Sequence, residues 1–457
     1  MNKFSNKKKI IFSLFLEKKE RNEIVAVFHK LHPSPLYFSV NDWYKYKKNP
    51  KNKKIFAVLR RARLIIQSPK EDQKELKRIR REYQERLQQV NQLYLVLTHN
   101  CNLQCKYCFV PYSFSPGERE VMMTPEIAKK GINLWTQHIE RNSLKELKYF
   151  IIFYGGEPLL NPLTLQESLN YIQTLQNARK LPKENLTKML FTNGTLVNEK
   201  IAQMLREYNV EVTISIDTPE RLHNIYRGDK KGKGTFKRVE KGLRILQEEG
   251  VNTSVSTVIT PMHLDRISEV LKFLEKKKIK KFALNPVVGK TIPLLDQNIN
   301  INNYYKQAAK KIIEIFVKGE KKGIHEEQVG WRVEAFKKRE FYPKECSIYG
   351  EQIVIQPDGH VSSCHVSPQY NIKHINDLEE NFDIRKNSLG KQLIKRLPLY
   401  NRECLNCEAI SICGGGCPWS VNEIKGSSWG RDERSCCLTK EIFNVLIWEN
   451  FKRSKSD

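Results

Sequence analysis

The sequence lacks a membrane-spanning run and a secretory signal. None of its apolar stretches reaches the length that a transmembrane helix needs. Near the N-terminus, basic residues precede a short apolar run from Ile10 to Leu16, but charged residues follow it and no small-residue cleavage site is present. We therefore expect a strand at this position, a cytoplasmic protein and no membrane partner. Repeats of solenoid length are also absent, which excludes a repeat array.

Acidic residues are few relative to basic ones. The 457-residue chain has 51 Asp and Glu against 79 Lys and Arg, a formal net charge of +28. Such an excess is compatible with nucleic acid, an anionic membrane surface or an acidic peptide as partner. Most lysines, however, are spread over predicted helix surfaces and connecting stretches such as Lys47 to Lys54, as on any solvated surface. Charge alone therefore selects no partner, and we expect none of the nucleic-acid class.

Cysteine is absent between Cys108 and Cys346. Of the eleven cysteines, three lie at positions 101 to 108 and eight after residue 345. In a reducing compartment, cysteines grouped in this way are typical of metal ligands rather than of disulfides. The chain is long enough for two or three domains, and its 40% apolar content indicates an ordered protein.

The first 90 residues predict a small α+β module, from strand-prone runs and helix-start signals. Ser68-Pro69-Lys70-Glu71 combines an N-cap, a first-turn proline and a capping-box glutamate, and predicts the start of a long helix. The other predicted elements are strands at Ile10 to Leu16 and Ile24 to His29, a turn at 32–35, a helix capped by Asn41, a helix at Ile55 to Arg63 and a short strand at Leu64 to Ile66.

Residues 91–290 predict strands that alternate with amphipathic helices, the pattern of a parallel sheet with right-handed crossovers. Six such units are two short of an eight-fold barrel, so we expect an open, TIM-like (β/α)6 partial barrel within an α/β fold. Residues 291–340 predict a helical connection, and 341–457 a Cys-rich module held by metal rather than by a large core. The six predicted strands are Leu93 to Thr98, Tyr149 to Tyr154, Lys188 to Thr192, Glu211 to Ile216, Thr253 to Ile259 and Lys281 to Leu284.

The first cysteine group is a C-x3-C-x2-C loop after the first barrel strand, formed by Cys101, Cys105 and Cys108. Four thiolates close a 4Fe-4S cluster, so three leave one iron open to an exogenous ligand. A zinc site, or a cluster completed by a distant cysteine, is the alternative. The segment from Cys101 to Phe109 resembles the signature of the radical S-adenosylmethionine (SAM) superfamily. This resemblance implies that S-adenosyl-L-methionine chelates the open iron and is cleaved to a 5′-deoxyadenosyl radical, which abstracts a substrate hydrogen.

Three further segments at successive strand ends resemble the cofactor site of that family. Gly155-Gly156-Glu157-Pro158 resembles the segment that holds the amino group of the cofactor, where glycines permit close backbone approach. Thr192-Asn193-Gly194 and Ser215-Ile216-Asp217 end the third and fourth strands, although ordinary strand-end turns explain them as well. The residues assigned to S-adenosylmethionine by this resemblance are Tyr107, Gly155, Gly156, Glu157, Asn193, Ser215, Asp217 and Arg227.

The second cysteine group has a C-x12-G-x4-C segment followed by C-x2-C-x5-C-x3-C and a Cys-Cys pair. It resembles the SPASM domain, which carries auxiliary iron-sulfur clusters; a zinc ribbon is the alternative. The resemblance implies two auxiliary 4Fe-4S clusters, the second of which lacks one cysteine and has an open iron that we expect to bind a substrate thiolate. The first set is Cys404, Cys407 and Cys413 with Cys436 or Cys437, and the second is Cys346, Cys364 and Cys417.

Among SPASM enzymes, two features favour a peptide maturase over an anaerobic sulfatase maturase. Sulfatase maturases typically carry Asp at the position of His365, a candidate catalytic base, and they generally begin near their cysteine loop. The N-terminal module resembles, in position and element order, the winged-helix element that binds precursor leaders. An extended leader peptide can add to its sheet edge.

We therefore predict a radical SAM/SPASM oxidoreductase that abstracts a hydrogen from a ribosomally synthesised precursor peptide and forms an intramolecular thioether or carbon-carbon crosslink. The expected partners are that precursor with its leader and an electron donor such as flavodoxin or ferredoxin. Two alternatives stay open: a sulfatase maturase that forms formylglycine, and a non-catalytic iron-sulfur or zinc protein that binds nucleic acid.

Overall fold

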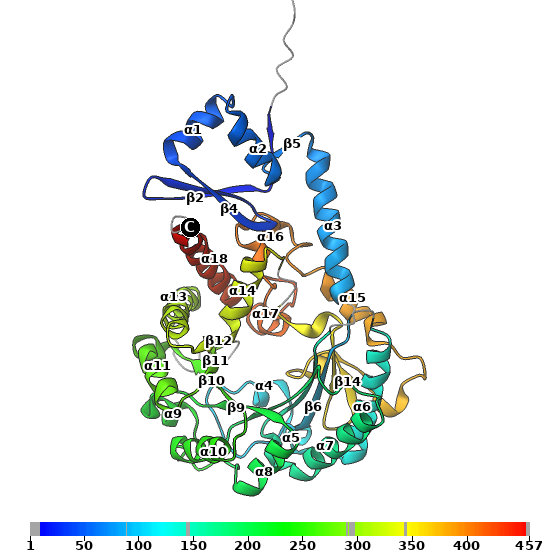
Figure 1. Cartoon of the computed structure of the whole chain (residues 1–457). Coiled ribbons are helices and arrows are strands. Elements are labelled where there is room, and N and C mark those ends of the chain that lie inside the picture. The colour runs from blue at the N-terminus through cyan, green and yellow to red at the C-terminus, as the bar shows by residue number, and fades with distance from the viewer. Residues whose placement is uncertain are drawn as a thin grey trace, which may run out of the picture.

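The computed structural model describes residues 10–87, 89–142, 147–288, 291, 298–341 and 345–453. The basic residues at 7 to 9 lie outside this range. A small N-terminal module stands at the top of Figure 1, the C-terminal helix α18 (Glu433–Arg453) lies beneath it, and an open barrel forms the lower half. None of the described helices combines the length and apolar character needed to cross a bilayer.

The barrel is built on a ten-stranded sheet in the order β12-β11-β10-β9-β8-β7-β6-β13-β14-β15. Its six central strands confirm the predicted partial barrel. They run parallel and match the predicted strands to within two residues at each end. Their bounds are β6 Gln92–Thr98, β7 Tyr149–Gly155, β8 Leu186–Thr192, β9 Val210–Ser215, β10 Thr253–Ile259 and β11 Lys281–Pro286.

The two faces of this sheet differ because side chains alternate along each strand. In β6, Leu93, Leu95 and Leu97 pack into the core beneath the covering helices, whereas Tyr94 points to the concave side. The helices lie on the outer, convex side in Figure 1. Those labelled there are α6 Pro125–Glu140, α7 Pro162–Asn177, α8 Glu199–Glu207, α9 Glu220–Tyr226, α10 Phe236–Glu248 and α11 Ile267–Lys276.

The sheet continues into the cysteine-rich region. β13 (Gln352–Ile355) runs parallel to β6, and β14 (His360–Ser362) and β15 (Asn371–His374) add antiparallel beyond it. Ile353 and Ile355 belong to the same core as the barrel strands. The predicted boundary at residue 341 therefore does not interrupt the sheet, and part of the C-terminal region rests on the barrel core.

The segment between barrel and cysteine-rich region is mainly helical, as predicted, with α13 (Ile301–Glu320) and α14 (Glu327–Lys338). It also contains a two-residue strand, β12 (His325–Glu326), that pairs in parallel with β11. The buried Glu326 side chain accepts hydrogen bonds from the Leu284 and Val329 backbones, which ties the start of α14 to the sheet.

The N-terminal module has a three-stranded antiparallel sheet in the order β2-β3-β4. β3 (Ile24–His29) matches its prediction, but the predicted turn at 32–35 is wrong, because those residues belong to β4 (His32–Ser39). Prolines are tolerated there because β4 is an edge strand, where a missing N–H costs no ladder bond. The remaining elements are β1 Ile11–Phe12, β2 Leu16–Arg21, α1 Val40–Lys48, α2 Lys53–Arg61, β5 Ile65–Ile66 and α3 Pro69–Leu87.

Two helix starts in this module test the capping predictions. The cap of α1 is Ser39 rather than Asn41: its hydroxyl accepts from the Asp42 backbone at 3.0 Å, and Asn41 lies inside the helix. α3 begins at Pro69 as predicted. The Glu71 side chain accepts from the Gln67 backbone at 2.9 Å and also pairs with Arg60.

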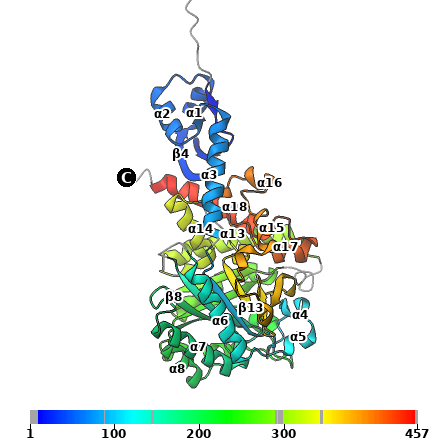
Figure 2. The ribbon, with the colours of Figure 1, turned by 90° about the vertical axis from the view of Figure 1, so that its right-hand side faces the viewer.

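Strand β3 joins the module to the rest of the molecule because both of its faces are buried. Val25 and Val27 pack with Trp43 of α1, whereas Phe28 lies on the opposite face, with its ring centroid 5.2 Å from that of Phe443 in α18. The views in Figures 1 and 2 agree in placing this sheet directly against α18. The module is therefore packed against the C-terminal helix rather than tethered by α3 alone.

Candidate functional site

The first cysteine group lies on the loop that follows β6. Burial is the main cause that raises the pKa of Cys101 to about 12 and that of Cys105 to about 11. The nearby Cys108 contributes to both rises. The loop is held by two backbone hydrogen bonds, from Gln104 N–H to the Gly228 carbonyl at 2.8 Å and from Lys106 N–H to the Tyr226 carbonyl at 2.9 Å. The structure thus gathers three thiols whose protons a metal would displace.

Gly155 and Gly156 are required by contact with this same loop. A Cβ atom on Gly155 would lie 2.1 Å from the Thr98 carbonyl oxygen, and one on Gly156 would lie 2.3 Å from that of Asn100. Gly155 also has φ +148°, in the region that favours glycine. Gly156 N–H donates to the Thr98 carbonyl at 2.9 Å. The two glycines therefore let the ends of β6 and β7 close on each other.

The Glu157 carboxylate joins two strand ends. It is fully buried and accepts from Thr192 Oγ1 at 2.7 Å, from the Asn193 backbone at 2.7 Å and from the Leu159 backbone at 3.0 Å. Burial raises the pKa of Glu157 to about 7, against these hydrogen bonds. Both carboxylate oxygens are engaged by these donors, so Glu157 holds the loop between the two strand ends.

Asn193 faces the cysteine loop from the end of β8. Its Nδ2 donates to Asn102 Oδ1 at 2.9 Å and lies 3.7 Å from Cys101 Sγ. Its Oδ1 accepts from the Thr195 backbone and hydroxyl. This side chain therefore orients the loop and provides a polar contact to one thiol.

Asp217 centres a buried polar group beside Cys105. It accepts from Arg227 Nε at 3.2 Å, from the Tyr107 hydroxyl and from the Val258 backbone at 2.9 Å. Burial opposes ionisation most strongly, but Arg227, His263, His223 and the Tyr107 hydroxyl together lower the pKa of Asp217. The Arg227 guanidinium also lies over the Tyr107 ring, 5.3 Å from its centroid. The structure brings these three predicted residues together.

Ser215 ends β9, two residues before Asp217, and pairs in register with Ser256 of β10. Its side chain lies on the concave face of the sheet, since the neighbouring Ile214 belongs to the core under the helices.

The C-terminal cysteines form two separate groups. The pKa of Cys364 is raised above its ordinary value by burial and by Cys346 and Cys417. The pKa of Cys436 is raised by burial and by Cys413 and Cys404. Cys407 in turn contributes to the raised pKa of Cys404. Burial raises the pKa of Cys437, and the other contributions come from charged side chains such as Lys306 rather than from other thiols. The α18 helix thus directs Cys436, and not Cys437, toward Cys404, Cys407 and Cys413.

Buried arginines hold the loops that carry these thiols. Arg332 of α14 pairs with Glu345 at 2.8 Å, next to Cys346, and Glu345 also accepts from the Gly416 backbone at 3.2 Å. Asp432 accepts from the Cys417 backbone at 3.0 Å and pairs with Arg434. The charge network therefore fixes the backbone on both sides of the second thiol group.

Residues 95–275 match the radical SAM superfamily, a span that contains the first cysteine loop and the strand ends around it. This part of the chain is a radical SAM domain.

Two curated relatives extend this radical SAM match. A radical SAM cyclopropyl synthase, TigE of Paramaledivibacter caminithermalis, is 28% identical over 461 residues, which cover 93% of this chain and 89% of the relative. A cysteine-type anaerobic sulfatase-maturating enzyme of Clostridium perfringens is 25% identical over 333 residues, covering 69% of this chain and 85% of the relative. The protein is therefore a maturase-type radical SAM enzyme.

Solved structures show the same fold. The enzyme anSMEcpe with bound AdoMet and the Cp18Cys peptide superposes with a TM-score of 0.65 at 22% identity, over 80% of this chain and 99% of that one. Streptococcus suis SuiB bound to precursor peptide SuiA gives 0.51 at 14% identity, over 93% of this chain and 100% of that one. The fold of this chain is thus shared with these structures over 80% and 93% of its length.

Membership of the superfamily implies S-adenosylmethionine and a 4Fe-4S cluster, and the strand-end residues fit that pair. The three thiols would supply the cluster ligands, and Asn193 and the Tyr107–Asp217–Arg227 group place polar atoms beside them. Glu157, Gly155 and Gly156 shape the loops rather than present a free side chain.

His365 lies on the concave face between two tyrosines. Its ring stacks on Tyr94 at 4.5 Å with an interplanar angle of 5°, and meets the Tyr154 ring edge-on at 4.5 Å. Burial lowers the pKa of His365 to about 4, so the ring is neutral near pH 7. Its Nδ1 is buried and has no hydrogen-bond partner among the described residues.

Tyr154 is a residue that sequence reasoning missed. Burial raises its pKa to about 12, and Cys108 and Cys364 add to the rise, so the ring lies near both the first cysteine loop and the C-terminal thiols. Burial also raises the pKa of Tyr94, and Cys346 and Cys364 add to that rise. In the sequence, the only sign of this location is that both tyrosines alternate with the core residues along their strands.

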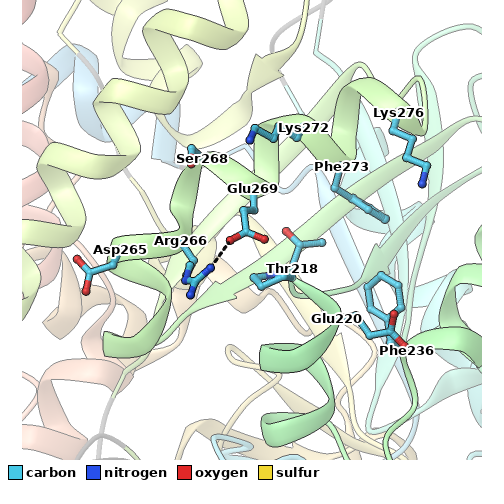
Figure 3. Close-up of a pocket in the computed structure, with 11 residues that line it drawn as sticks. Thr218, Glu220, Phe236, Asp265, Arg266, Ser268, Glu269, Lys272, Phe273 and Lys276 are labelled. Carbon is cyan, nitrogen blue, oxygen red and sulfur yellow. Dashed lines mark hydrogen bonds and ion pairs between the residues drawn. The ribbon is translucent and has the colours of Figure 1, made fainter.

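An open pocket lies elsewhere in the molecule. It measures about 510 Å³ and is bordered by Phe236 at the start of α10 and by Arg266, Glu269 and Phe273 at α11, as Figure 3 shows. Arg266 and Glu269 pair at its edge at 3.2 Å. No cysteine lines this pocket, which is formed by helices of the outer layer and is separate from the thiol groups.

Proposed function

We propose that this radical SAM enzyme is a maturase of a ribosomally synthesised precursor peptide and forms an intramolecular crosslink in it. The main support for this proposal is the share of the chain that each relative matches. The cyclopropyl synthase and SuiB match over 93% of the chain, which takes in most of the N-terminal module, whereas the sulfatase maturase leaves 31% unmatched. Of the two crosslink types, the name of the cyclopropyl synthase favours a carbon-carbon bond.

The N-terminal sheet suits recognition of an extended leader. Both β2 and β4 are edge strands, and an extended peptide can add to such an edge through main-chain hydrogen bonds. We favour β2, because β4 contains Pro33 and Pro35, which lack N–H groups. The Lys18 backbone N–H of β2 donates to the Glu17 side chain at 3.1 Å instead of to a strand, so it faces the open edge.

In the crosslinking reaction the peptide loses two hydrogens. The 4Fe-4S cluster and S-adenosylmethionine, when bound, supply the radical chemistry that takes one of them as an atom. The second leaves as a proton with one electron, which requires a base and an acceptor. His365 is the candidate base on the concave face, and two auxiliary clusters held by the C-terminal thiols are the candidate acceptors. An open iron at the Cys346, Cys364 and Cys417 set would also bind a substrate cysteine.

Deleting residues 1–67 tests the leader proposal. We expect binding of a labelled leader peptide, measured by fluorescence anisotropy, to be abolished, while iron content and peptide-independent release of 5′-deoxyadenosine persist. Leader affinity equal to that of the full chain contradicts the proposal. Because Phe28 packs on Phe443, the deletion also uncovers α18, so retained iron and cofactor cleavage serve as the folding control.

A matched pair at Lys18 keeps the whole module. Lys18→Pro removes the outward N–H, whereas Lys18→Ala removes the side-chain amine and its contacts with Glu20 and Tyr44 but keeps that N–H. We expect Lys18→Pro to weaken leader binding by about tenfold, the scale of one lost hydrogen bond, and Lys18→Ala to have a smaller effect. Equal affinities for the two variants contradict addition at the β2 edge.

A sulfatase maturase is the second candidate, supported by the higher TM-score of anSMEcpe. The two functions differ in product. Incubation with a cysteine-containing sulfatase peptide that lacks any leader yields formylglycine only under this second function. Crosslinking of a leader-bearing precursor supports the first function. It lowers the peptide mass by two hydrogens per bond, and trypsin digestion then fails to separate the two joined fragments.

A further inference from the structure

A basic turn lies against the solvent side of the first cysteine loop. It connects α9 to α10 and carries Lys230, Lys231 and Lys233, whose side chains are exposed. Gly232 at its tip has φ +74°, which favours glycine and permits the tight reversal. The three lysines make no ion pair with any described residue.

The turn is attached directly to the cysteine loop. Leu103 and Asp229 form an antiparallel bridge, and Gln104 N–H donates to the Gly228 carbonyl at 2.8 Å. On the loop itself, Gln104 and Lys106 are exposed on either side of Cys105. The surface of the turn is therefore continuous with the surface that covers this thiol.

The one acidic side chain in the turn is already neutralised. The Asp229 carboxylate accepts from the Lys231 and Lys233 backbones at 3.0 and 2.9 Å and pairs with Arg238 at 2.8 Å. The side chains that the turn exposes are therefore basic, and they lie next to the loop that carries Cys105.

We propose that Lys106, Lys230, Lys231 and Lys233 form the docking surface for an acidic one-electron carrier of the flavodoxin or ferredoxin class. This inference rests on the proposed radical SAM chemistry. In the docked complex one electron leaves the carrier, which is oxidised, and reduces the iron-sulfur group that the three thiolates hold. No covalent bond forms or breaks between the two proteins. Complementary charge raises the association rate and sets the orientation.

An acidic leader is less suited to this surface. The flanking helices α9 and α10 lie in the barrel, away from the N-terminal sheet at the opposite end of the molecule in Figure 1. A leader bound at that sheet would occupy a separate region. Competition between leader and carrier would therefore indicate that the turn binds the leader instead.

The test is the full-length triple variant Lys230→Glu, Lys231→Glu and Lys233→Glu. Its matched control reverses Lys148, Lys180 and Lys183, which are equally exposed but precede β7 and β8, at the opposite ends of the strands. Binding of purified flavodoxin is measured at low and at physiological ionic strength. We expect the turn variant to bind at least about tenfold more weakly at low salt, with a reduced salt dependence, and the control to change by less than about twofold.

Cofactor cleavage then separates docking from chemistry. With dithionite as reductant we expect both variants to release 5′-deoxyadenosine at the wild-type rate. With reduced flavodoxin, only the turn variant should show a raised KM for the carrier. Carrier affinity unchanged in the turn variant, equal weakening in both variants, or displacement of the carrier by leader peptide overturns the docking proposal. Absence of 5′-deoxyadenosine from the wild type with dithionite contradicts the proposed function instead.

Discussion

The barrel rim, formed by the loops that follow β6 to β9, and the C-terminal cysteine region both gather thiols, but on different elements. At the rim, the cysteine loop follows the ends of long parallel strands, and glycine contacts, the hydrogen bonds of Thr192 and Asn193 to Glu157 and the buried Arg227–Asp217 pair hold it in place. In the C-terminal region the thiols lie mainly on short turns, on the single-turn helix α16 (Arg402–Leu405) and at the start of α18, and buried ion pairs such as Arg332–Glu345 brace them.

This difference indicates that the two regions depend on metal to different extents. A loop at the end of a packed sheet keeps its shape when empty, because hydrophobic core fixes the strands. The C-terminal loops lie on shorter elements and depend more on buried charge pairs, in which desolvation offsets much of the ionic attraction. We infer that metal binding contributes more to the fold of the C-terminal region than to that of the rim.

We expect the largest loss of iron and of cofactor cleavage from a substitution at Gly156, on the barrel rim. In Gly156→Ala the new methyl would meet backbone oxygens of His99 and Asn100 at 2.5 and 2.3 Å, and neither can move without shifting β6. Overpacking of this kind costs about 1–3 kcal/mol. We expect iron at the first cysteine loop and release of 5′-deoxyadenosine to fall at least about tenfold. Gly117→Ala is the control, because no atom lies within 4 Å of its Cβ position; equal losses in both variants would contradict the contact argument.

The next effect should come from the C-terminal region, through two adjacent cysteines. Cys436→Ser removes a thiol that faces Cys404 and Cys413, whereas Cys437→Ser alters one that lies near surface charges. We expect only the first variant to lose iron, by about one cluster, and to change the reduced EPR spectrum. Reductive cofactor cleavage at the rim should persist in both. Loss of iron in Cys437→Ser with full iron in Cys436→Ser would reverse the assignment.

The smallest effect concerns the pH dependence of the rim. The pKa of buried Glu157 is raised to about 7, so the folded protein binds this proton more tightly than the unfolded chain does. Its contribution to stability is present below about pH 4.5 and is lost as pH rises through about 7. In Glu157→Gln we expect the fall in unfolding free energy between pH 5 and pH 8 to shrink by up to about 3 kcal/mol.

Urea titrations of both proteins at the two pH values measure this difference. Glu326, whose pKa burial also raises to about 7, remains in both proteins and therefore cancels from the comparison. An identical pH dependence in wild type and Glu157→Gln would show that Glu157 is ionised throughout, held by its three hydrogen-bond donors.

Much of the architecture was predictable because it depends on local patterns. The alternation of apolar and polar residues located all six parallel strands, and Ser68 with Pro69 located the start of α3. The turn expected at 32–35 was wrong because proline chemistry is local, whereas tolerance of proline depends on the strand's place at the sheet edge. Asn41 failed as a cap for a related reason, since Ser39 two residues earlier already supplies the oxygen.

By itself, the sequence determined which residues are candidates for the chemistry, through the spacing of eleven cysteines and the order of motifs at successive strand ends. Only the tertiary structure decided how they meet. It directed Cys436 rather than Cys437 to the other thiols, assigned Glu157 to the loop, and placed His365 against Tyr94. The physical reason is that spacing along a chain specifies ligand types, whereas helix phase, burial and contacts between distant strands specify direction.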